Sequence, residues 1–190
     1  MARDAEQTKQ RLLEAAIAEF SAHGIAGARV DRIAATARAN KSLIYSYFGS
    51  KEKLFEAVTA ALLLNTVGEA PITPHDLPGY AVALYDSYLR RPEVLRLSMW
   101  FRLEAGADTP EPEALRRANA AKVAAIKTAQ QAGTVRTDIG AAELLAVIIS
   151  LSLVGAYSAP GLDVAAQPAA ARKRQREAVR AAVASAISPS

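Results

Sequence analysis

The chain contains no cysteine, which excludes disulfide bonds and thiolate metal sites and makes a reducing compartment the expected one. It has only two histidines, His23 and His75, and no Gly-rich phosphate loop or metal-spaced cluster. The longest apolar run, residues 144–159, contains serine and glycine and is short for a hydrocarbon core of about 30 Å. The charged N-terminus lacks the apolar core of a signal peptide. We therefore expect a soluble, cytoplasmic protein with no membrane span, no cofactor, no metal and no catalytic residues.

Aromatic residues are also scarce, at 6%, whereas 51% of the 190 residues are apolar and alanine is very common. Alanine is the best helix former, so this composition favours helices over strands. Leu13, Ile17 and Phe20 repeat at helical spacing ahead of Gly24, a residue type that often ends a helix. The pattern predicts an all-α protein of about nine helices. The first helix is expected to end near Gly24, and the fourth to start near Lys51. The others are expected at about residues 30–37, 41–47, 77–90, 92–105, 112–131, 141–158 and 169–187.

Positive charge is concentrated in one window of the chain. The net charge is +4, and residues 29–53 contain six Lys or Arg against Asp31 and Glu52, so the rest of the chain is neutral overall. Local positive charge points to an anionic partner. In the same window, the expected helix over 30–37 would bury Val30, Ile33 and Ala34, and only residues 38–40 separate it from the next helix. Two short helices joined in this way form a helix-turn-helix, whose second helix enters the DNA major groove.

The segment "NKSLIYSYFGSK", residues 40–51, combines apolar and hydrogen-bonding side chains. Asn40 is a candidate N-cap of its helix, and Ser50 of the following one, which would bury Leu54, Phe55 and Val58. Ile44 and Phe48 can face the core, while the polar residues share another face. Lys41 and Ser42, near the helix start, can contact base edges or phosphates, and Leu43 can contact a thymine methyl. Lys51 lies in the first turn of the following helix, where backbone amides already favour an anion. The candidate DNA-binding residues are Arg29, Asn40, Lys41, Ser42, Leu43, Tyr45, Ser46, Tyr47 and Lys51.

Other interpretations of these residues stay open. Tyr45 and Tyr47 can be partly buried core residues whose hydroxyls find backbone partners. Lys41 and Lys51 can be ordinary solvated charges.

The stretch from Thr8 to about Val58 resembles the DNA-binding domain of the TetR family of transcriptional regulators. The similarity rests on "LLEAAIAEFSAHG", then on "RVDRIAATARANKSLIYSYFGSKEKLFEAV". Within it, "YSYFGSKEKL" is similar to the family's Tyr–x–His/Tyr–Phe and Ser–Lys–Glu–x–Leu signature. The resemblance implies DNA contacts for Tyr45, Tyr47 and Lys51.

The sequence also departs from the family pattern at several positions. Ala28 and Arg29 stand where the family usually has Thr or Ser before the second helix, and Arg38 stands at a turn position where glycine is common. Ser42 and Leu43 replace a frequent Gly–Thr pair. These changes are compatible with the fold but leave the operator sequence open.

The remainder of the chain resembles the family only as a helical region of the expected size. For this region, the family implies a small-molecule cavity and a homodimer formed by the last two long helices. The nearly all-apolar helix that starts at residue 141 must be buried on most sides, and one side could pack on a second subunit. Aromatic and thioether side chains of the middle helices can line a cavity, although such residues are more often plain core. The candidate pocket residues are Leu84, Tyr85, Tyr88, Leu95, Met99, Trp100, Leu103, Ile126, Ile148 and Leu151.

The basic stretch "AARKRQREAVR", residues 170–180, has two interpretations. It can be a second nucleic-acid patch or a localisation tag. The favoured alternative is the solvent face of a final helix whose Ala178, Val179, Ala182, Val183 and Ile187 pack inward.

We therefore expect a homodimeric DNA-binding repressor that a small-molecule effector releases from a palindromic operator. Its expected divisions are a helix-turn-helix domain (1–50), a connecting helix (51–67) and a helical effector-binding and dimerisation domain (68–190). The alternatives are an effector-independent DNA-binding protein and, with less support, a small all-α enzyme.

Overall fold

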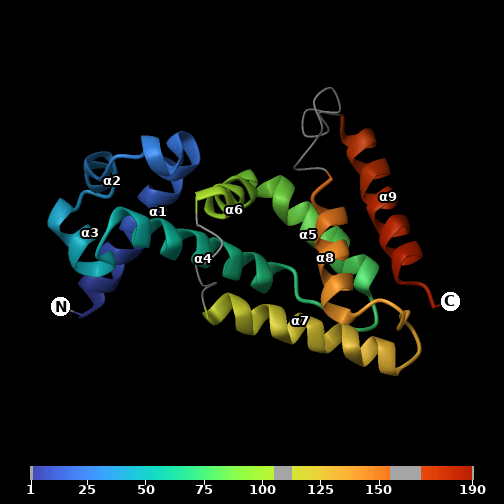
Figure 1. The fold of residues 1–190 in the computed structure, drawn as a ribbon. Helices are drawn as coiled ribbons and strands as arrows, with labels where there is room; N and C mark the ends of the chain where they lie inside the picture. Colours follow the sequence, from blue (N-terminus) through green and yellow to red (C-terminus); the bar gives the residue numbers. More distant parts are fainter. Residues whose placement is uncertain (1, 105–112, 155–167, 190) are drawn as a thin grey trace. The chain divides into compact units, whose positions relative to one another are not determined.

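The computed structural model describes residues 2–104, 113–154 and 168–189, and every regular element in these ranges is an α-helix (Figure 1). The all-α fold expected from the sequence is thus confirmed. The helices are α1 (Ala2–Gly27), α2 (Val30–Thr36), α3 (Lys41–Phe48), α4 (Lys51–Glu69), α5 (Leu77–Arg90), α6 (Pro92–Glu104), α7 (Glu113–Gln131), α8 (Ala141–Ser152) and α9 (Ala169–Ile187).

Most helix boundaries lie where the sequence places them, and α8 is the main exception. It was expected to continue to residue 158, but it ends at Ser152, and Leu153 and Val154 form a turn. The hydroxyls of Ser150 and Ser152 donate to the carbonyls four residues earlier, and the Leu153 N–H turns back to the Ser150 carbonyl. Serine hydroxyls that compete for helical carbonyls weaken a helix. Residues 155–158 and residue 112, where the expected helices end and begin, lie outside the described residues.

The chain forms two compact units. The N-terminal unit contains α1, α2, α3, the first part of α4, and α6. Its core includes Leu12, Phe20, Ile33 and Ile44, together with the expected Leu54, Phe55 and Val58 of α4. The rings of Phe20 and Phe55 meet edge to face with centroids 5.1 Å apart. On α1, Phe20 is buried together with Leu12 and Ala16, whereas Leu13 and Ile17 are half-buried.

Gly24 interrupts α1, as its type suggested, but the chain resumes a helical turn to Gly27. Its backbone has φ 64° and ψ −177°, a region that essentially only glycine adopts. A Cβ at this position would lie 3.2 Å from the ring of Trp100 on α6. Glycine therefore permits both the backbone turn and the close approach of the indole.

The C-terminal unit contains the last turn of α4 with α5, α7, α8 and α9. Within it, α5 packs against both α8 and α9, and α7 packs against α8. On α9, Val179, Val183 and Ile187 are buried as expected, but Ala178 and Ala182 are exposed. The expectation for these two alanines is wrong because only a narrow stripe of α9, with residues four apart, packs into the unit.

In the described ranges, no helix combines the length and the apolar character needed to cross a membrane.

Candidate nucleic-acid interface

The recognition helix α3 begins with a cap that sequence reasoning identified. The Asn40 side-chain oxygen accepts hydrogen bonds from the Ser42 backbone N–H (2.9 Å) and the Ser42 hydroxyl (2.8 Å). The Asn40 oxygen is therefore committed to holding the helix start, and the Ser42 oxygen keeps its acceptor capacity. Ser42 and Ser46 are both exposed, so α3 presents hydroxyls to solvent.

Lys41 does not stand free at the start of α3. Its ammonium lies 2.8 Å from the carboxylate of Asp31 on α2, and both side chains are largely exposed. The hydrogen bond from Lys41 and its charge lower the pKa of Asp31, and the same contact raises the pKa of Lys41. Both groups are therefore charged at neutral pH, and the pair joins the two helices of the motif.

The two tyrosines of α3 have different surroundings. Tyr45 is 47% exposed, which rules out the alternative that it belongs to the core. Tyr47 is half-buried, and its ring meets Phe48 edge to face at 6.3 Å. Leu43 is also half-buried. Tyr45 and the serines thus form the open surface of α3, while Tyr47 has both a packing side and an accessible side.

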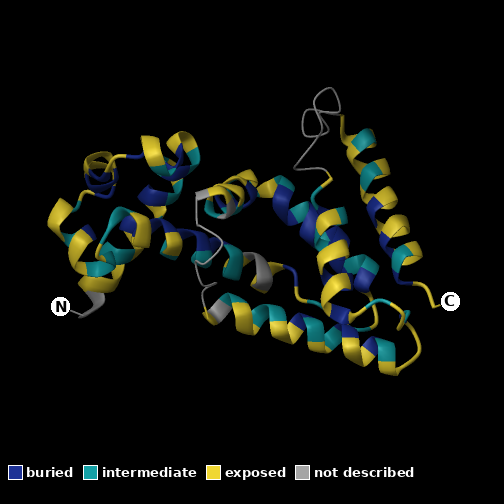
Figure 2. Ribbon diagram, in the orientation of Figure 1, coloured by how far each residue is buried: buried dark blue, intermediate teal, exposed yellow. Residues whose placement is uncertain are grey.

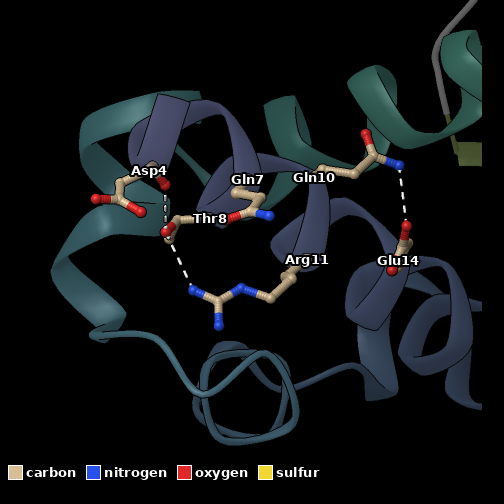
Figure 3. Close-up of a pocket in the computed structure, with 6 residues that line it drawn as sticks. All are labelled: Asp4, Gln7, Thr8, Gln10, Arg11 and Glu14. Carbon is tan, nitrogen blue, oxygen red and sulfur yellow. Dashed lines mark hydrogen bonds between the residues drawn. The ribbon is translucent and has the colours of Figure 1, made fainter. Parts of the chain in front are cut away.

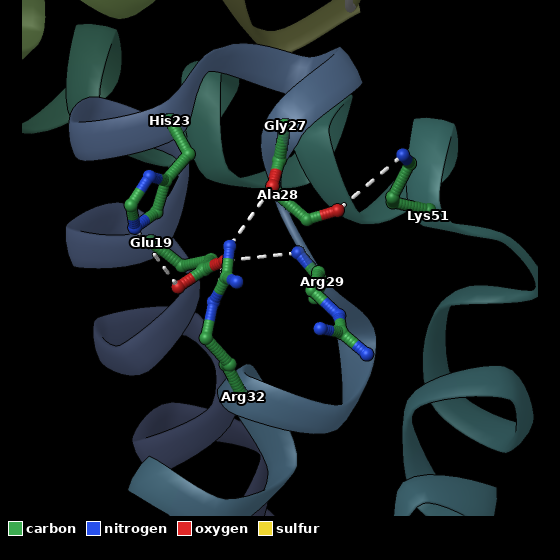
Figure 4. A network of polar contacts seen from close by, with 7 residues as sticks. All are labelled: Glu19, His23, Gly27, Ala28, Arg29, Arg32 and Lys51. Carbon is green, nitrogen blue, oxygen red and sulfur yellow. Dashed lines mark hydrogen bonds and ion pairs between the residues drawn. The ribbon is translucent and has the colours of Figure 1, made fainter.

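A largely buried carboxylate that was not among the candidates from the sequence holds the start of α2 (Figure 4). Glu19 of α1 accepts hydrogen bonds from the Arg29 backbone N–H (2.8 Å) and from Arg32 Nε (2.7 Å), and Arg32 also donates to the Gly27 carbonyl. Only 10% of the Glu19 side chain is exposed. Burial by itself would raise the pKa of Glu19, but hydrogen bonds from Arg32 and Arg29 and the neighbouring positive charges lower it overall. One feature of the sequence pointed to such a partner: Arg29 stands at the N-cap position of α2, and arginine is a poor capping residue, so the helix start needed a hydrogen-bond acceptor from elsewhere.

Arg29 and Lys51 lie near this network (Figure 4). The Lys51 ammonium is 3.5 Å from the Ala28 carbonyl, which brings the start of α4 next to the start of α2. Arg29 is exposed, and within the described part of the chain its guanidinium has no ion-pair partner. The two helix starts therefore place two cations on one side of the motif.

The turn between α2 and α3 contains a residue in an unfavourable backbone conformation. Arg38 has φ 51°, the only positive φ of a non-glycine residue in the described ranges. The Ala39 N–H closes the turn on the Ala34 carbonyl at 3.0 Å. This left-handed conformation explains physically why glycine suits this position in a helix-turn-helix turn.

The candidate pocket residues are divided between the two units. On α6, in the N-terminal unit, Leu95 is buried, whereas Met99, Trp100 and Leu103 are exposed. In the C-terminal unit, five residues are buried and Leu151 is half-buried; the buried ones are Leu84, Tyr85, Tyr88, Ile126 and Ile148. Tyr80, which was not among the candidates, is also buried there, and its hydroxyl has no hydrogen-bond partner among the described residues.

An open hollow on α1 has a different character (Figure 3). All six of its lining residues are polar and belong to α1, and Thr8 accepts a hydrogen bond from Arg11 while Gln10 donates to Glu14. A surface made by one helix whose polar groups bond to one another offers little to a small molecule.

The N-terminal unit therefore has the arrangement of a helix-turn-helix DNA-binding protein. The second helix of the motif, α3, is capped by Asn40 and exposes the hydroxyls of two serines and a tyrosine, and cations lie at the starts of α2 and α4. Family comparison agrees. Residues 12–58 match the model described as "Bacterial regulatory proteins, tetR family", and residues 76–185 match the model "Tetracyclin repressor-like, C-terminal domain".

Individual relatives extend this agreement over most of the chain. The HTH-type transcriptional repressor SCO4008 of Streptomyces coelicolor is 44% identical over 152 residues, which cover 80% of this chain and 79% of the relative. The HTH-type transcriptional repressor NicS of Pseudomonas putida is 31% identical, over 79% of this chain and 76% of the relative. The crystal structure of the putative transcriptional regulator SCO4942 from Streptomyces coelicolor superposes with a TM-score of 0.79 at 35% identity, covering 95% of this chain and 98% of that one. The chain belongs to the TetR family and is a DNA-binding transcriptional regulator.

Proposed function

We propose that this protein is a homodimeric repressor that a small-molecule effector releases from a palindromic operator. The observation that carries the proposal is the exposed surface of α3, where Ser42, Tyr45 and Ser46 face solvent on a helix capped by Asn40. Two similar relatives are named as transcriptional repressors, which supports repression as the mode of action. As a DNA-binding regulator it would act in the cytoplasm, where the DNA lies.

Within this proposal, the candidate DNA contacts take different roles. Ser42, Leu43, Tyr45 and Ser46 contact base edges or the adjacent backbone, and Tyr47 contacts phosphate with its accessible side. Arg29, Lys41 and Lys51 supply positive charge toward phosphates. Asn40 acts mainly by holding the start of α3, because its oxygen is already engaged with Ser42.

The exposed face of α8 supports a homodimer. Val147 on α8 and Val154 in the turn after it remain exposed, at 39% and 45%, and exposed and half-buried residues follow one side of α8 in Figure 2. On α9, Ala178, Ala181 and Ala182 form an exposed stripe of small residues. Apolar and small residues exposed at helical spacing suit a helix–helix interface between subunits. A two-fold dimer would place two α3 helices on half-sites one helical turn, about 34 Å, apart.

The interior of the C-terminal unit is the proposed effector site. The buried Tyr80 hydroxyl lacks a hydrogen-bond partner among the described residues, and such a group is costly unless a ligand or water satisfies it. The proposed lining is the set of candidate residues of this unit, and Tyr88 among them lies on α5, the helix that also carries Tyr80. The division expected from the sequence, with DNA binding in 1–50, a connecting helix in 51–67 and effector binding and dimerisation in 68–190, remains part of the proposal.

The connecting helix α4 offers a route for coupling. It begins beside the Ala28 carbonyl, and its last residue, Glu69, accepts a hydrogen bond from Ser87 of α5. Glu69 also forms ion pairs with Arg90, the last residue of α5, and with Arg91, which follows it. A ligand that repacks α5 would act on α4 through these contacts. Effector and operator would then bind antagonistically and reciprocally, with a coupling of about 1–3 kcal/mol.

Selection of bound sequences from random DNA tests the proposal. Enrichment of one palindrome is expected, and Ser42→Ala and Leu43→Ala should then change base preference at defined positions. Lys51→Ala should instead weaken binding about equally on all sequences. Binding without any sequence preference would contradict the proposal and favour the effector-independent DNA-binding protein, and turnover of an added substrate would favour the enzyme.

A further inference from the structure

The basic stretch on α9 packs against α5 in the C-terminal unit and helps to line an open hollow there. Arg172, Arg176 and Arg180 are four residues apart, so they share one side of α9. An open hollow in this region is lined by Arg172 and Arg176 of α9 and by Tyr85, Asp86, Leu89 and Arg90 of α5. Three guanidinium groups therefore line one small space within the C-terminal unit.

Carboxylates within the hollow neutralise only part of this charge. Arg176 donates to Asp86 at 2.7 Å, and Asp86 is the only acidic residue of the lining. Arg90 lies 3.7 Å from Glu69, which pairs more closely with Arg91. Arg172 has no ion-pair partner within the described part of the chain. The hollow therefore carries a net positive charge, and Arg172 has a free set of donors.

The floor of the hollow is held in place by a chain of hydrogen bonds. The Tyr85 hydroxyl donates to the Gln175 side-chain oxygen at 3.1 Å, and the Gln175 amide nitrogen donates to the Val154 carbonyl at 3.4 Å. Burial is the main cause that raises the pKa of Tyr85, so its phenol is neutral at physiological pH. The bond between Tyr85 and Gln175 links α5 to α9 beside the hollow that Arg172 and Arg176 line.

We propose that this hollow between α5 and α9 binds a small organic molecule that carries two anionic groups. Guanidinium groups bind carboxylates and phosphates in planar, paired hydrogen bonds, and Arg172 together with Arg90 or Arg176 offers two such positions. The half-buried side chain of Leu89 provides apolar contact for the carbon skeleton between the charges. The hollow is open to solvent, and Tyr85 is the one lining residue that it shares with the positions proposed for the effector.

The geometry of α9 supplies a matched control. Lys173 and Arg174 are exposed and do not line the hollow; at about 100° per residue Arg174 lies opposite the side that carries Arg172 and Arg176, and Lys173 lies about a quarter turn from it. The double variants Arg172→Gln/Arg176→Gln and Lys173→Gln/Arg174→Gln remove the same charge from the same helix. Arg172→Gln alone serves where loss of the Arg176–Asp86 pair lowers stability, because Arg172 has no ion-pair partner to lose in the described ranges.

Calorimetric titration of the full chain with citrate and with pyrophosphate tests the proposal, with sodium chloride at matched ionic strength as the reference. We expect binding of at least one anion to the unmodified chain, about tenfold weaker binding in Arg172→Gln, and a change of less than about twofold in Lys173→Gln/Arg174→Gln. Tighter binding of citrate would indicate a polycarboxylate, and tighter binding of pyrophosphate a phosphorylated compound.

Three outcomes would overturn the proposal. Heats of titration with citrate and pyrophosphate no larger than those with sodium chloride would show that the hollow binds neither anion. An equal loss of anion affinity in the two double variants would show that the anions are attracted by the overall charge of α9 and not by the hollow. Displacement of the anion by a short DNA duplex, sensitive to Arg172→Gln, would reassign the surface to nucleic acid.

Discussion

At the scale of single residues, the pair between Asp31 and Lys41 determines how much charge α3 presents to DNA. The Lys41 ammonium is held at 2.8 Å by a carboxylate that itself lies on the surface of the motif. Asp31→Asn removes a negative charge close to the expected phosphates and releases Lys41. We expect about 3- to 10-fold tighter binding to all DNA sequences and a salt slope whose magnitude rises by about one. Fluorescence anisotropy across a salt series measures both quantities.

The control for this prediction is Glu56→Gln, which makes the same change in charge at an exposed position of α4. An equal gain in affinity in Glu56→Gln would show that only overall charge matters. Weaker binding in Asp31→Asn, with lost base preference, would show instead that Asp31 positions Lys41 for reading bases.

Glu19 gives the N-terminal unit a dependence on pH. Its pKa is lower than the ordinary value of 4.5, and this depression comes from Arg32 and Arg29 acting against burial. A carboxylate with a depressed pKa in the folded state stabilises the fold above its unfolded pKa, and this contribution is lost as the pH falls through about 4.5 and below. Glu19→Gln should lower the free energy of unfolding by about 1–3 kcal/mol at pH 7 and lessen its fall between pH 5 and pH 3.

Urea denaturation at several pH values checks this expectation, with Glu14→Gln on the exposed side of α1 as the control. If the free energy of unfolding falls with pH equally in Glu19→Gln and in the unmodified chain, Glu19 does not cause the loss of stability in acid.

At the scale of helices, the break in α1 and its contact with α6 form one feature. Gly24 combines a positive φ with a Trp100 ring that lies 3.2 Å from the position of a Cβ. Arg96 strengthens the same contact by donating to the Ser21 carbonyl at 3.0 Å. We expect Gly24→Ala to lower the free energy of unfolding by about 1–3 kcal/mol and to change the fluorescence of Trp100. Chemical denaturation followed by tryptophan fluorescence measures both effects.

Gly27→Ala is the matched control, because Gly27 lies on the same helix and a Cβ there would meet only His23 at 3.4 Å, an ordinary contact. The double variant Gly24→Ala/Trp100→Leu separates the two causes. It should recover the steric part of the loss and keep the part that comes from the backbone. Equal stability of the Gly24→Ala and Gly27→Ala variants would contradict this account of the break.

At the scale of the whole molecule, the proposed dimer depends on the exposed side of α8. Val147→Asp places a charge at the centre of that face, and a charge buried in an interface without a partner is costly. We expect the dimer dissociation constant to rise by about 10- to 100-fold and the affinity for a palindrome to fall toward that for a half-site. Light scattering coupled to gel filtration measures the first effect, and binding to full and half-sites measures the second.

Ala124→Asp, at an exposed position of α7, is the control, and thermal denaturation followed by circular dichroism verifies that both variants fold. An unchanged dimer in Val147→Asp would place the interface elsewhere.

The sequence alone was sufficient for the helices and for the motif of the N-terminal unit. Their signals are local: alanine content, spacing of three to four residues, a capping asparagine and a serine at a helix start depend only on neighbours along the chain. Asn40 caps α3 and Ser50 caps α4 as predicted, and the ends of α5 and α9 agree with the pattern. The fixed spacing of the "YSYFGSKEKL" motif likewise made the family recognisable without a structure.

Only the tertiary structure decided which charged groups meet. Glu19 and Arg32 are 13 residues apart, Asp31 and Lys41 lie on different helices, and Arg176 and Asp86 are 90 residues apart. No periodicity connects such positions, because their contact depends on how helices pack and not on the repeat within one helix. For the same reason the pattern on α9 identified Val179 and Val183 correctly but overestimated the burial of Ala178 and Ala182. A helical repeat shows which residues share a side, whereas the width of the packed stripe is set by the neighbouring helices.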